Sequence, residues 1–173
     1  MSIEIRPERP EDRDRSLEIE QLAFGSDEEV AIVEGVRDEV GSFALVAELD
    51  GELVGHVQLS RAWIGENAVL ALGPVGVLPD HQGQEIGSAL IWAALEAAQA
   101  NGEAAVILLG SQAFYPRFGF EPASGLGWRN PFTGVQPDGF VIREEDFMVA
   151  VLDGHARDLS GEVRWQPAFG QAS

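Results

Sequence analysis

Two almost wholly apolar segments, Ala68 to Leu78 and Ala104 to Leu109, constrain the fold most strongly. Apolar runs of this length are typical of strands that are covered on both faces. Between them lies a turn signal, Pro79 to Gly83, and then a pattern that predicts a helix from about Glu85 to Ala100. Asn101-Gly102 is a typical helix end. A strand, a helix and a second buried strand form a crossover, the connection that parallel strands require.

The rest of the chain predicts antiparallel elements around this crossover. Asp50-Gly51 is a strong hairpin signal between two strand patterns. The order of elements therefore predicts a single α+β domain over residues 1–173, with a mixed, mostly antiparallel sheet flanked by helices. Parallel pairing is expected only around the crossover. The other expected strands are Ile3–Ile5, Phe43–Leu49, Leu53–Ile64, Phe147–Leu152 and Val163–Trp165. The other expected helices are one from Pro10 with an apolar stripe of Leu17, Ile19, Leu22 and Phe24, one from Ser26-Asp27 through Val40, and a short one at Ala113–Arg117. Residues Gly119–Val141 are expected to form a loop with one short strand.

The charge of the chain narrows its partners. Acidic residues number 29 and basic residues 11, all of them arginine, so the formal charge is −18. Binding to nucleic acid needs a basic surface, so we expect no nucleic-acid partner. The field favours a cationic substrate over an anionic one, although acidity can also serve only to keep a protein soluble. The chain has no cysteine, which excludes disulfides, thiolate metal sites and a cysteine nucleophile.

Nothing in the sequence predicts a membrane segment. The first residues, Met1 to Arg6, lack the charged and then apolar pattern of a signal peptide. No apolar run approaches the roughly 18 residues of a membrane span. We therefore expect a cytoplasmic protein.

The turn after the first apolar strand is the first motif that carries chemistry. The segment Leu72 to Leu90 reads LGPVGVLPDHQGQEIGSAL, a strand, a tight turn and the start of a helix. Backbone N–H groups at a helix start are unpaired and carry partial positive charge, so such a turn suits a pyrophosphate. Gly83 and Gly87 let the backbone come close to a ligand. Pro74 has no N–H for a strand ladder and marks a bulge or a loss of pairing. A glycine-rich turn can also be only a structural connection, and neither the dinucleotide fingerprint nor the P-loop pattern is present.

The second motif is AFYPRFGF, Ala113 to Phe120, which follows the next buried strand. Tyr115 is the only tyrosine of the chain. Taken alone it is either a packed helix residue with a satisfied hydroxyl or a proton donor.

Together the two motifs resemble the GNAT superfamily of acetyl-CoA-dependent N-acetyltransferases, from Ile3 to about Phe169. The chain is most similar to the small bacterial branch of YhbS-like predicted acetyltransferases, which combines LGPxxVxPxxQG with a later YPRFGF and a strand like Asp146 to Val149. The resemblance implies the GNAT-like acyl-CoA N-acyltransferase fold, with a splayed central strand pair. It implies acetyl-CoA as cosubstrate and no metal. Many relatives are dimers, so a homodimer is an open alternative.

The family pattern Q/R-x-x-G-x-G/A falls on Gln82, Gly83, Gln84, Glu85, Ile86 and Gly87. By this resemblance the amides of Gln84 to Ser88 hold the CoA pyrophosphate. The backbone of Val75, Gly76 and Val77 binds the pantetheine, and Tyr115 protonates the departing thiolate.

One position departs from the family pattern, because Glu85 stands where the family has the first glycine of the pair. A carboxylate repels a pyrophosphate, by about 3 kcal/mol at ~5 Å and an effective dielectric near 20. Either the Glu85 side chain points to solvent and only its N–H faces the phosphate, or CoA binding is weakened.

The sequence leaves the proton acceptor and the acceptor site open. The strand position where some GNAT enzymes carry a glutamate falls near Ala71, so we name His56 as the catalytic candidate beside Tyr115, with Glu20, Glu28 and Glu29 as alternatives. A lone histidine can also be a satisfied structural residue. Arg117 either forms a salt bridge within the loop or contacts a CoA phosphate. Three aromatic residues either line an acceptor pocket or only pack the loop: Trp128, Phe132 and Phe140.

These inferences predict an enzyme that moves an acetyl group from acetyl-CoA to a primary amine by direct attack. The acceptor is a small molecule or a peptide, and a polyamine, an aminoglycoside and a peptide N-terminus all fit. The alternative is a catalytically weak or inactive acyl-CoA-binding module with the same fold.

Overall fold

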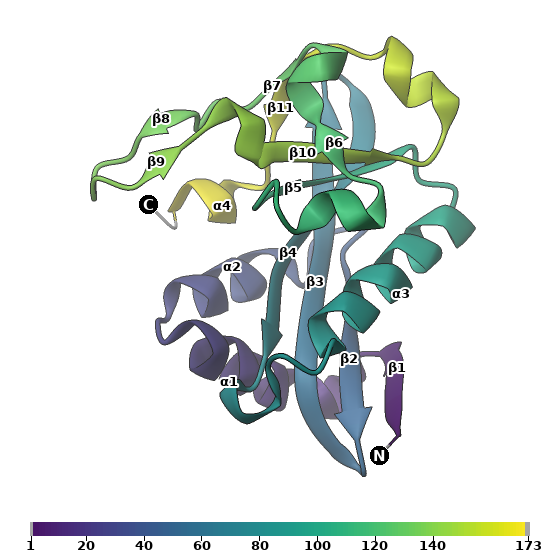
Figure 1. The fold of residues 1–173 in the computed structure, drawn as a ribbon, viewed down its shortest axis with the longest axis vertical. Coiled ribbons are helices and arrows are strands. Elements are labelled where there is room, and N and C mark those ends of the chain that lie inside the picture. The colour runs from purple at the N-terminus through teal and green to yellow at the C-terminus, as the bar shows by residue number, and fades with distance from the viewer. Residues whose placement is uncertain (1, 172–173) are drawn as a thin grey trace. The chain divides into compact units, whose positions relative to one another are not determined.

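The computed structural model describes residues 2–171, and the chain in it falls into two compact units (Figure 1). The first unit comprises residues 1–60 and 72–96, and the second comprises residues 61–71 and 97–171, as far as they are described. The chain passes from one unit to the other within β3 (Glu52–Ile64), β4 (Asn67–Val77) and α3 (Ile86–Ala100).

The first unit is built on an antiparallel sheet in the order β1-β2-β3-β4. Strand β1 (Ile3–Pro7) pairs with β2 (Phe43–Leu49), which forms the expected hairpin with β3. The Leu78 amide donates to the Val54 carbonyl at 2.9 Å and so joins the end of β4 to β3. The helices of this unit are α1 (Arg13–Phe24), α2 (Glu28–Val36) and the first part of α3.

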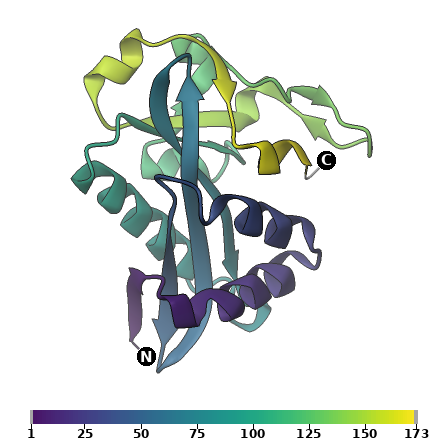
Figure 2. The same ribbon diagram turned by 180° about the vertical axis from the view of Figure 1, so that it is seen from behind.

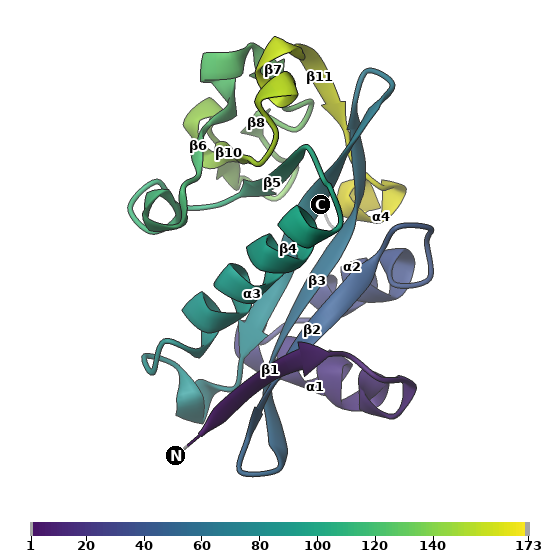
Figure 3. The same cartoon turned by 90° about the vertical axis from the view of Figure 1, so that its right-hand side faces the viewer.

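Alternation along β3 sends neighbouring side chains to opposite faces of this sheet. A methyl group built on Gly55 would lie 2.9 Å from Leu90 Cδ1 and 3.2 Å from Ile86 Cγ2, so Gly55 faces α3. The next residue, His56, reaches Glu20 on α1. Figures 2 and 3 show the same arrangement in the ribbon, with α1 and α2 on one face of the strands and α3 on the other.

The second unit collects shorter strands. Its part of β4 pairs parallel with β5 (Ala105–Leu109) at Leu70–Val106 and Ala71–Ile107, and β5 pairs antiparallel with β10 (Phe147–Val151). The remaining pairs join β10 to β6 (Glu121–Pro122), β3 to β11 (Gly161–Arg164), β11 to β7 (Trp128–Arg129) and β8 (Gly134–Val135) to β9 (Val141–Ile142), and α4 (Pro167–Gln171) follows β11.

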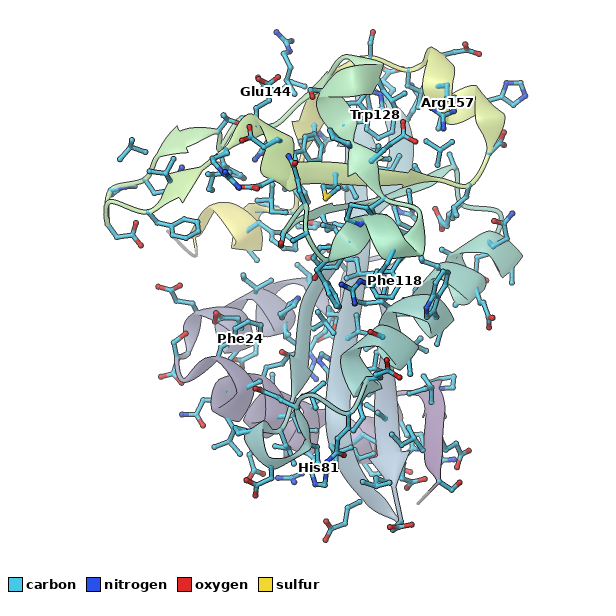
Figure 4. The ribbon with its side chains drawn as sticks, in the orientation of Figure 1. Phe24, His81, Phe118, Trp128, Glu144 and Arg157 are labelled. Atoms are coloured by element: carbon cyan, nitrogen blue, oxygen red, sulfur yellow. The ribbon has the colours of Figure 1, made fainter. Side chains whose placement is uncertain are left out.

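Trp128 is central to the core of the second unit. Its side chain is fully buried, and its indole N–H donates to the Leu159 carbonyl at 2.8 Å. Figure 4 shows Trp128 in the interior of this unit. Phe147 and Trp165 pack in the same cluster, with ring centroids 5.7 Å apart.

The prediction of a mixed, mostly antiparallel sheet flanked by helices is confirmed, and so is the parallel pair at the crossover. Confining parallel pairing to the crossover was wrong, because β7 and β11 also pair parallel. The second helix ends at Val36 instead of continuing through Val40, which is 92% exposed. The segment 119–141 holds several short strands and a 3-10 helix (Ala123–Leu126) instead of one strand in a loop.

The apolar stripe predicted on the first helix was also wrong in part. Leu22 and Phe24 are 45% and 48% exposed, whereas the buried residues of α1 are Ser16, Ile19 and Glu20. A buried glutamate on this helix is a first indication of chemistry. Among the described residues, no helix is long and apolar enough to cross a membrane.

Candidate functional site

The turn between β4 and α3 combines unusual backbone angles with an open surface (Figure 1). Gly83 and Glu85 both have left-handed backbone angles, with φ of +81° and +66°. The Gln82 side-chain amide donates to the Val77 carbonyl at 2.9 Å and so ties the turn to the end of β4. Gln82, Gly83, Gln84 and Glu85 are all exposed. The turn is therefore tied to β4 by the Gln82 side chain and is accessible to a ligand.

The start of α3 presents free donors at this turn. The Ala89 amide donates to the Glu85 carbonyl at 3.0 Å, which makes Glu85 the N-cap residue of α3. The amides of Ile86, Gly87 and Ser88 come before Ala89, the first residue whose N–H donates within the helix, so they have no partner within the helix. A methyl group built on Gly83 would meet nothing within 4 Å, and one on Gly87 would meet only Val77 Cγ2, at 3.8 Å. The backbone at this helix start is thus open to an anion such as a pyrophosphate.

Val75, Gly76 and Val77 are the last three residues of β4, directly before the turn, and Val75 and Val77 are half-buried. Gly76 is buried against α1. A methyl group built on Gly76 would collide with Glu20 Oε1 and lie 3.0 Å from Glu20 Cδ and 3.2 Å from Ala23 Cβ. Glycine at this position leaves the room that the Glu20 carboxylate occupies.

Glu20 and His56 form a buried pair beside Gly76. Both side chains are fully buried, and His56 Nδ1 lies 2.5 Å from Glu20 Oε2. Burial raises the pKa of Glu20 above its ordinary range. The hydrogen bond with His56 and the charge of that imidazole oppose the rise, and the charge of Glu29 adds to it. The structure therefore brings together two of the residues that the sequence named separately as proton acceptors.

The sequence left the Glu20–His56 contact unpredicted because the two residues are 36 positions apart. A local signal was present in Ser16, Ile19, Glu20 and Ala23, which lie at helical spacing and are small or polar apart from Ile19. The other carboxylate candidates are less enclosed, since Glu28 is exposed and Glu29 is half-buried and hydrogen-bonded to Ser26 Oγ at 3.0 Å.

Tyr115 lies in the second unit, at the start of a 3-10 helix (Tyr115–Phe118). Its ring packs edge-on against Phe114 and Phe120, with centroids 5.0 Å and 5.8 Å away. A methyl group on Gly110 would collide with the ring, so this glycine makes room for it. Burial raises the pKa of Tyr115, which keeps its hydroxyl protonated at neutral pH.

The structure also shows the surroundings of Arg117 and of the three aromatic candidates, which lie in the same unit. Arg117 is exposed, donates from Nε to the Phe114 carbonyl at 2.8 Å and lies 4.5 Å from the Phe114 ring centroid. Trp128 packs the core, and Phe132 packs against the same cluster. Phe140 is 66% exposed and lines a hollow of about 350 Å³ together with Leu109 and Ile142.

Comparison with known proteins gives one consistent match. Residues 4–120 match the model of the Acetyltransferase (GNAT) family. The uncharacterized N-acetyltransferase YjhQ of Escherichia coli K12 is 34% identical over 158 residues, which are 85% of this chain and 83% of YjhQ. The expected resemblance in sequence is confirmed.

Solved structures agree over nearly the whole chain. The crystal structure of the GNAT family N-acetyltransferase YhbS from Escherichia coli in complex with CoA aligns with a TM-score of 0.86 and 29% identity, and covers 97% of this chain and 92% of that one. A GNAT family acetyltransferase from Brucella melitensis in complex with acetyl-CoA aligns with a TM-score of 0.74 and 28% identity, and covers 97% and 98%. The expected fold is confirmed.

Proposed function

The chain belongs to the GNAT acetyltransferase family, and from that membership we propose that it transfers an acetyl group from acetyl-CoA to a primary amine. The observation that carries the proposal is the open helix start at Ile86 to Ser88, which follows β4 directly. Two relatives of similar structure, YhbS and the protein from Brucella melitensis, are in complex with CoA and acetyl-CoA.

The cofactor site that we propose runs from β4 into α3. The amides of Gln84 to Ser88 hold the pyrophosphate, and Gln82 and Gly83 shape the turn. The backbone of Val75, Gly76 and Val77 binds the pantetheine. Glu85 is exposed, which supports the reading that its side chain points to solvent while its N–H faces the phosphate.

Tyr115 and His56 are the catalytic residues of the proposal. The acceptor amine attacks the thioester carbon, and bringing the two together supplies about 7–11 kcal/mol of the barrier when the geometry is good. The backbone amide of Val77 stabilises the oxygen that becomes negative. Tyr115 gives a proton to the departing thiolate, a role that requires a protonated hydroxyl, and burial favours the protonated form. His56 takes part in removing a proton from the amine, a role that its contact with Glu20 beside β4 supports.

The acceptor is a small molecule or a peptide with a primary amine. The charge of −18 favours a cationic acceptor, such as a polyamine, an aminoglycoside or a peptide N-terminus. We place this activity in the cytoplasm of a bacterial cell, and a homodimer stays an open alternative. The alternative function is an acyl-CoA-binding module with weak or no turnover, which Glu85 and the alanine at position 71 favour.

Release of free thiol from acetyl-CoA tests the proposal. The purified protein is incubated with spermidine, kanamycin or an alanine-led tripeptide, and the acetylated amine is identified by mass spectrometry. Turnover with an amine supports the enzyme, and binding of acetyl-CoA without turnover supports the module. Tyr115→Phe should lower kcat by about 10²-fold or more, as loss of a general acid does, with little change in the acetyl-CoA Kd. An unchanged kcat would remove Tyr115 from the mechanism.

A further inference from the structure

Three titratable side chains stand in line on one face of the β1–β4 sheet in the first unit. They are Glu8, which follows β1, His56 on β3 and Glu20 on α1. His56 Nδ1 lies 2.5 Å from Glu20 Oε2, and His56 Nε2 lies 3.5 Å from Glu8 Oε2. The imidazole is fully buried, and the Glu8 and Glu20 side chains are 7% and 0% exposed. Each ring nitrogen of His56 therefore faces a different carboxylate.

The inner end of this line meets β4. Glu20 Oε2 faces His56, while Glu20 Oε1 faces Gly76, where a side chain of any size would displace it. Glu20 Oε1 has no hydrogen-bond partner among the described residues. A buried carboxylate oxygen without a partner is costly, so its place beside β4 calls for a donor that binds there. An amine that attacks a thioester held on β4 is such a donor.

The outer end of the line meets a hollow. Glu8 lines a cavity of about 420 Å³ between the end of β1, the start of α1, the residue after α2 and the start of β2, together with Arg13, Arg37 and Gln58. Arg37 Nη2 lies 3.6 Å from Glu8 Oε2, and Arg13 Nε lies 4.0 Å from Glu8 Oε1. Arg13 is 41% exposed and pairs with Asp38 at 2.8 Å, so this end reaches the surface.

We propose that Glu20, His56 and Glu8 form a proton relay that carries one proton of the acceptor amine from β4 to the hollow beside β1. The inference rests on the proposed acetyltransferase function and assigns Glu20, rather than His56, as the residue that meets the amine. The relay uses the tautomer with the proton on His56 Nε2: Nδ1 accepts the proton from Glu20 as Nε2 gives its own to Glu8, and Glu8 delivers it to water. His56 also positions Glu20. Glu8 is a residue that the sequence did not single out.

The protons of the reaction balance with this relay. An ammonium group loses two protons when it becomes an amide. The C–N bond forms at the thioester carbon, the C–S bond breaks, and the sulfur leaves with its electron pair. One proton ends on the CoA sulfur, with Tyr115 as its donor, and Tyr115 recovers its proton as the amide forms. The other proton leaves through Glu20, His56 and Glu8.

The surroundings of the line suit proton transfer. The charged groups that face it are Glu29 from α2, Arg37 just after α2, and Arg13 at the start of α1 with its partner Asp38. Burial raises the pKa of Glu20, which makes its carboxylate a stronger base than an exposed one. The 3.5 Å between His56 and Glu8 exceeds a direct hydrogen bond, so the last transfer requires an approach of a few tenths of an ångström or one bridging water.

The first test compares pH profiles of kcat. Glu20→Gln keeps the shape of the side chain but cannot accept a proton, and Glu18→Gln is the matched control, because Glu18 lies on the same helix, is 55% exposed and pairs with Arg15. We expect Glu20→Gln to lower kcat at neutral pH by about 10²-fold or more, with recovery at a pH where the acceptor amine is already neutral. The Kd for acetyl-CoA and the profile of the control should match the unchanged protein.

Turnover of the unchanged protein with spermidine, kanamycin or the tripeptide separates the two proposals. If it turns over none of them, the proposed function falls. If it turns over and Glu20→Gln keeps both its kcat and its pH profile, the relay falls and the function stands. A loss of kcat by the same factor at every pH would mean that Glu20 has only a structural role, and would also overturn the relay.

The second test needs no turnover. The short hydrogen bond between His56 Nδ1 and Glu20 Oε2 should give a proton resonance far downfield in the NMR spectrum, assigned by its loss in His56→Gln. We expect Glu20→Gln to abolish it as well, and Glu8→Gln to keep it while its exchange with water slows severalfold. An exchange rate that Glu8→Gln leaves unchanged would overturn the exit through Glu8.

Discussion

Replacing Glu85 by glycine tests the backbone of the turn between β4 and α3 directly. Glu85 has φ of +66°, and its carbonyl accepts the first hydrogen bond of α3. A residue with a side chain costs roughly 1–2 kcal/mol in this conformation. Glycine relieves this cost but loses more conformational freedom on folding, which offsets roughly 0.5–1 kcal/mol of the gain in stability. We therefore expect Glu85→Gly to raise the free energy of unfolding by about 0.5–1 kcal/mol.

Glu85→Ala is the matched control, because it removes the carboxylate but keeps the Cβ atom that the left-handed conformation disfavours. It should be no more stable than the unchanged protein in urea unfolding monitored by circular dichroism, with equal m-values. If Glu85→Gly is no more stable than Glu85→Ala, the left-handed conformation at position 85 costs nothing, which would contradict the strain expected from its φ of +66°.

The same two variants separate charge from conformation in binding. An exposed carboxylate is screened by water, so its repulsion of a pyrophosphate should be well below the roughly 3 kcal/mol of a shielded pair. Both variants should tighten acetyl-CoA by a similar factor below about tenfold, or ~1.4 kcal/mol, in a calorimetric titration. A gain far above tenfold would contradict the solvent-facing side chain and would favour the weak-binding module.

Two further predictions concern the first unit. Gly55→Ala should lower its stability by about 1–3 kcal/mol in urea unfolding, because the new methyl group would lie 2.9 Å from Leu90 Cδ1; a neutral result would mean that α3 can yield at this contact. Asp12→Asn should cost about 2 kcal/mol at pH 7, because Arg6 bonds the Asp12 carboxylate at 2.7 Å and lowers its pKa. A lowered pKa gives stability that is present above the unfolded-state pKa of about 3.9 and is lost as the pH falls through the folded-state value. The two proteins should therefore converge in thermal unfolding below that range, and a constant difference down to pH 2 would contradict the ion pair.

The local patterns of the sequence were enough to predict the crossover and its turn. Apolar runs placed β4 and β5, and helical periodicity placed α3 to within a residue or two of its observed bounds. The turn from Gln82 to Gly87 and Tyr115 were recognisable because the residues that define each motif are adjacent in the chain. Adjacency of this kind needs no knowledge of the tertiary fold.

The Glu20–His56–Glu8 line could not be predicted in the same way. Its members come from three separate elements, and each residue alone has an ordinary structural explanation. The exposed Leu22 and Phe24 misled the assignment of the buried face of α1, because an apolar stripe normally marks that face. The left-handed angle of Glu85 was also hidden, since the sequence shows a helix-forming residue where the backbone calls for glycine.

A calorimetric titration with acetyl-CoA tests the central claim most directly. We expect saturable binding to the unchanged protein. Binding should weaken clearly in Gly87→Asp, which places a carboxylate at the open helix start beside Val77. The control variant is Ser124→Asp, in the second unit, which should bind acetyl-CoA as the unchanged protein does. An unchanged protein that is folded and does not bind acetyl-CoA would contradict both the acetyltransferase and the binding module.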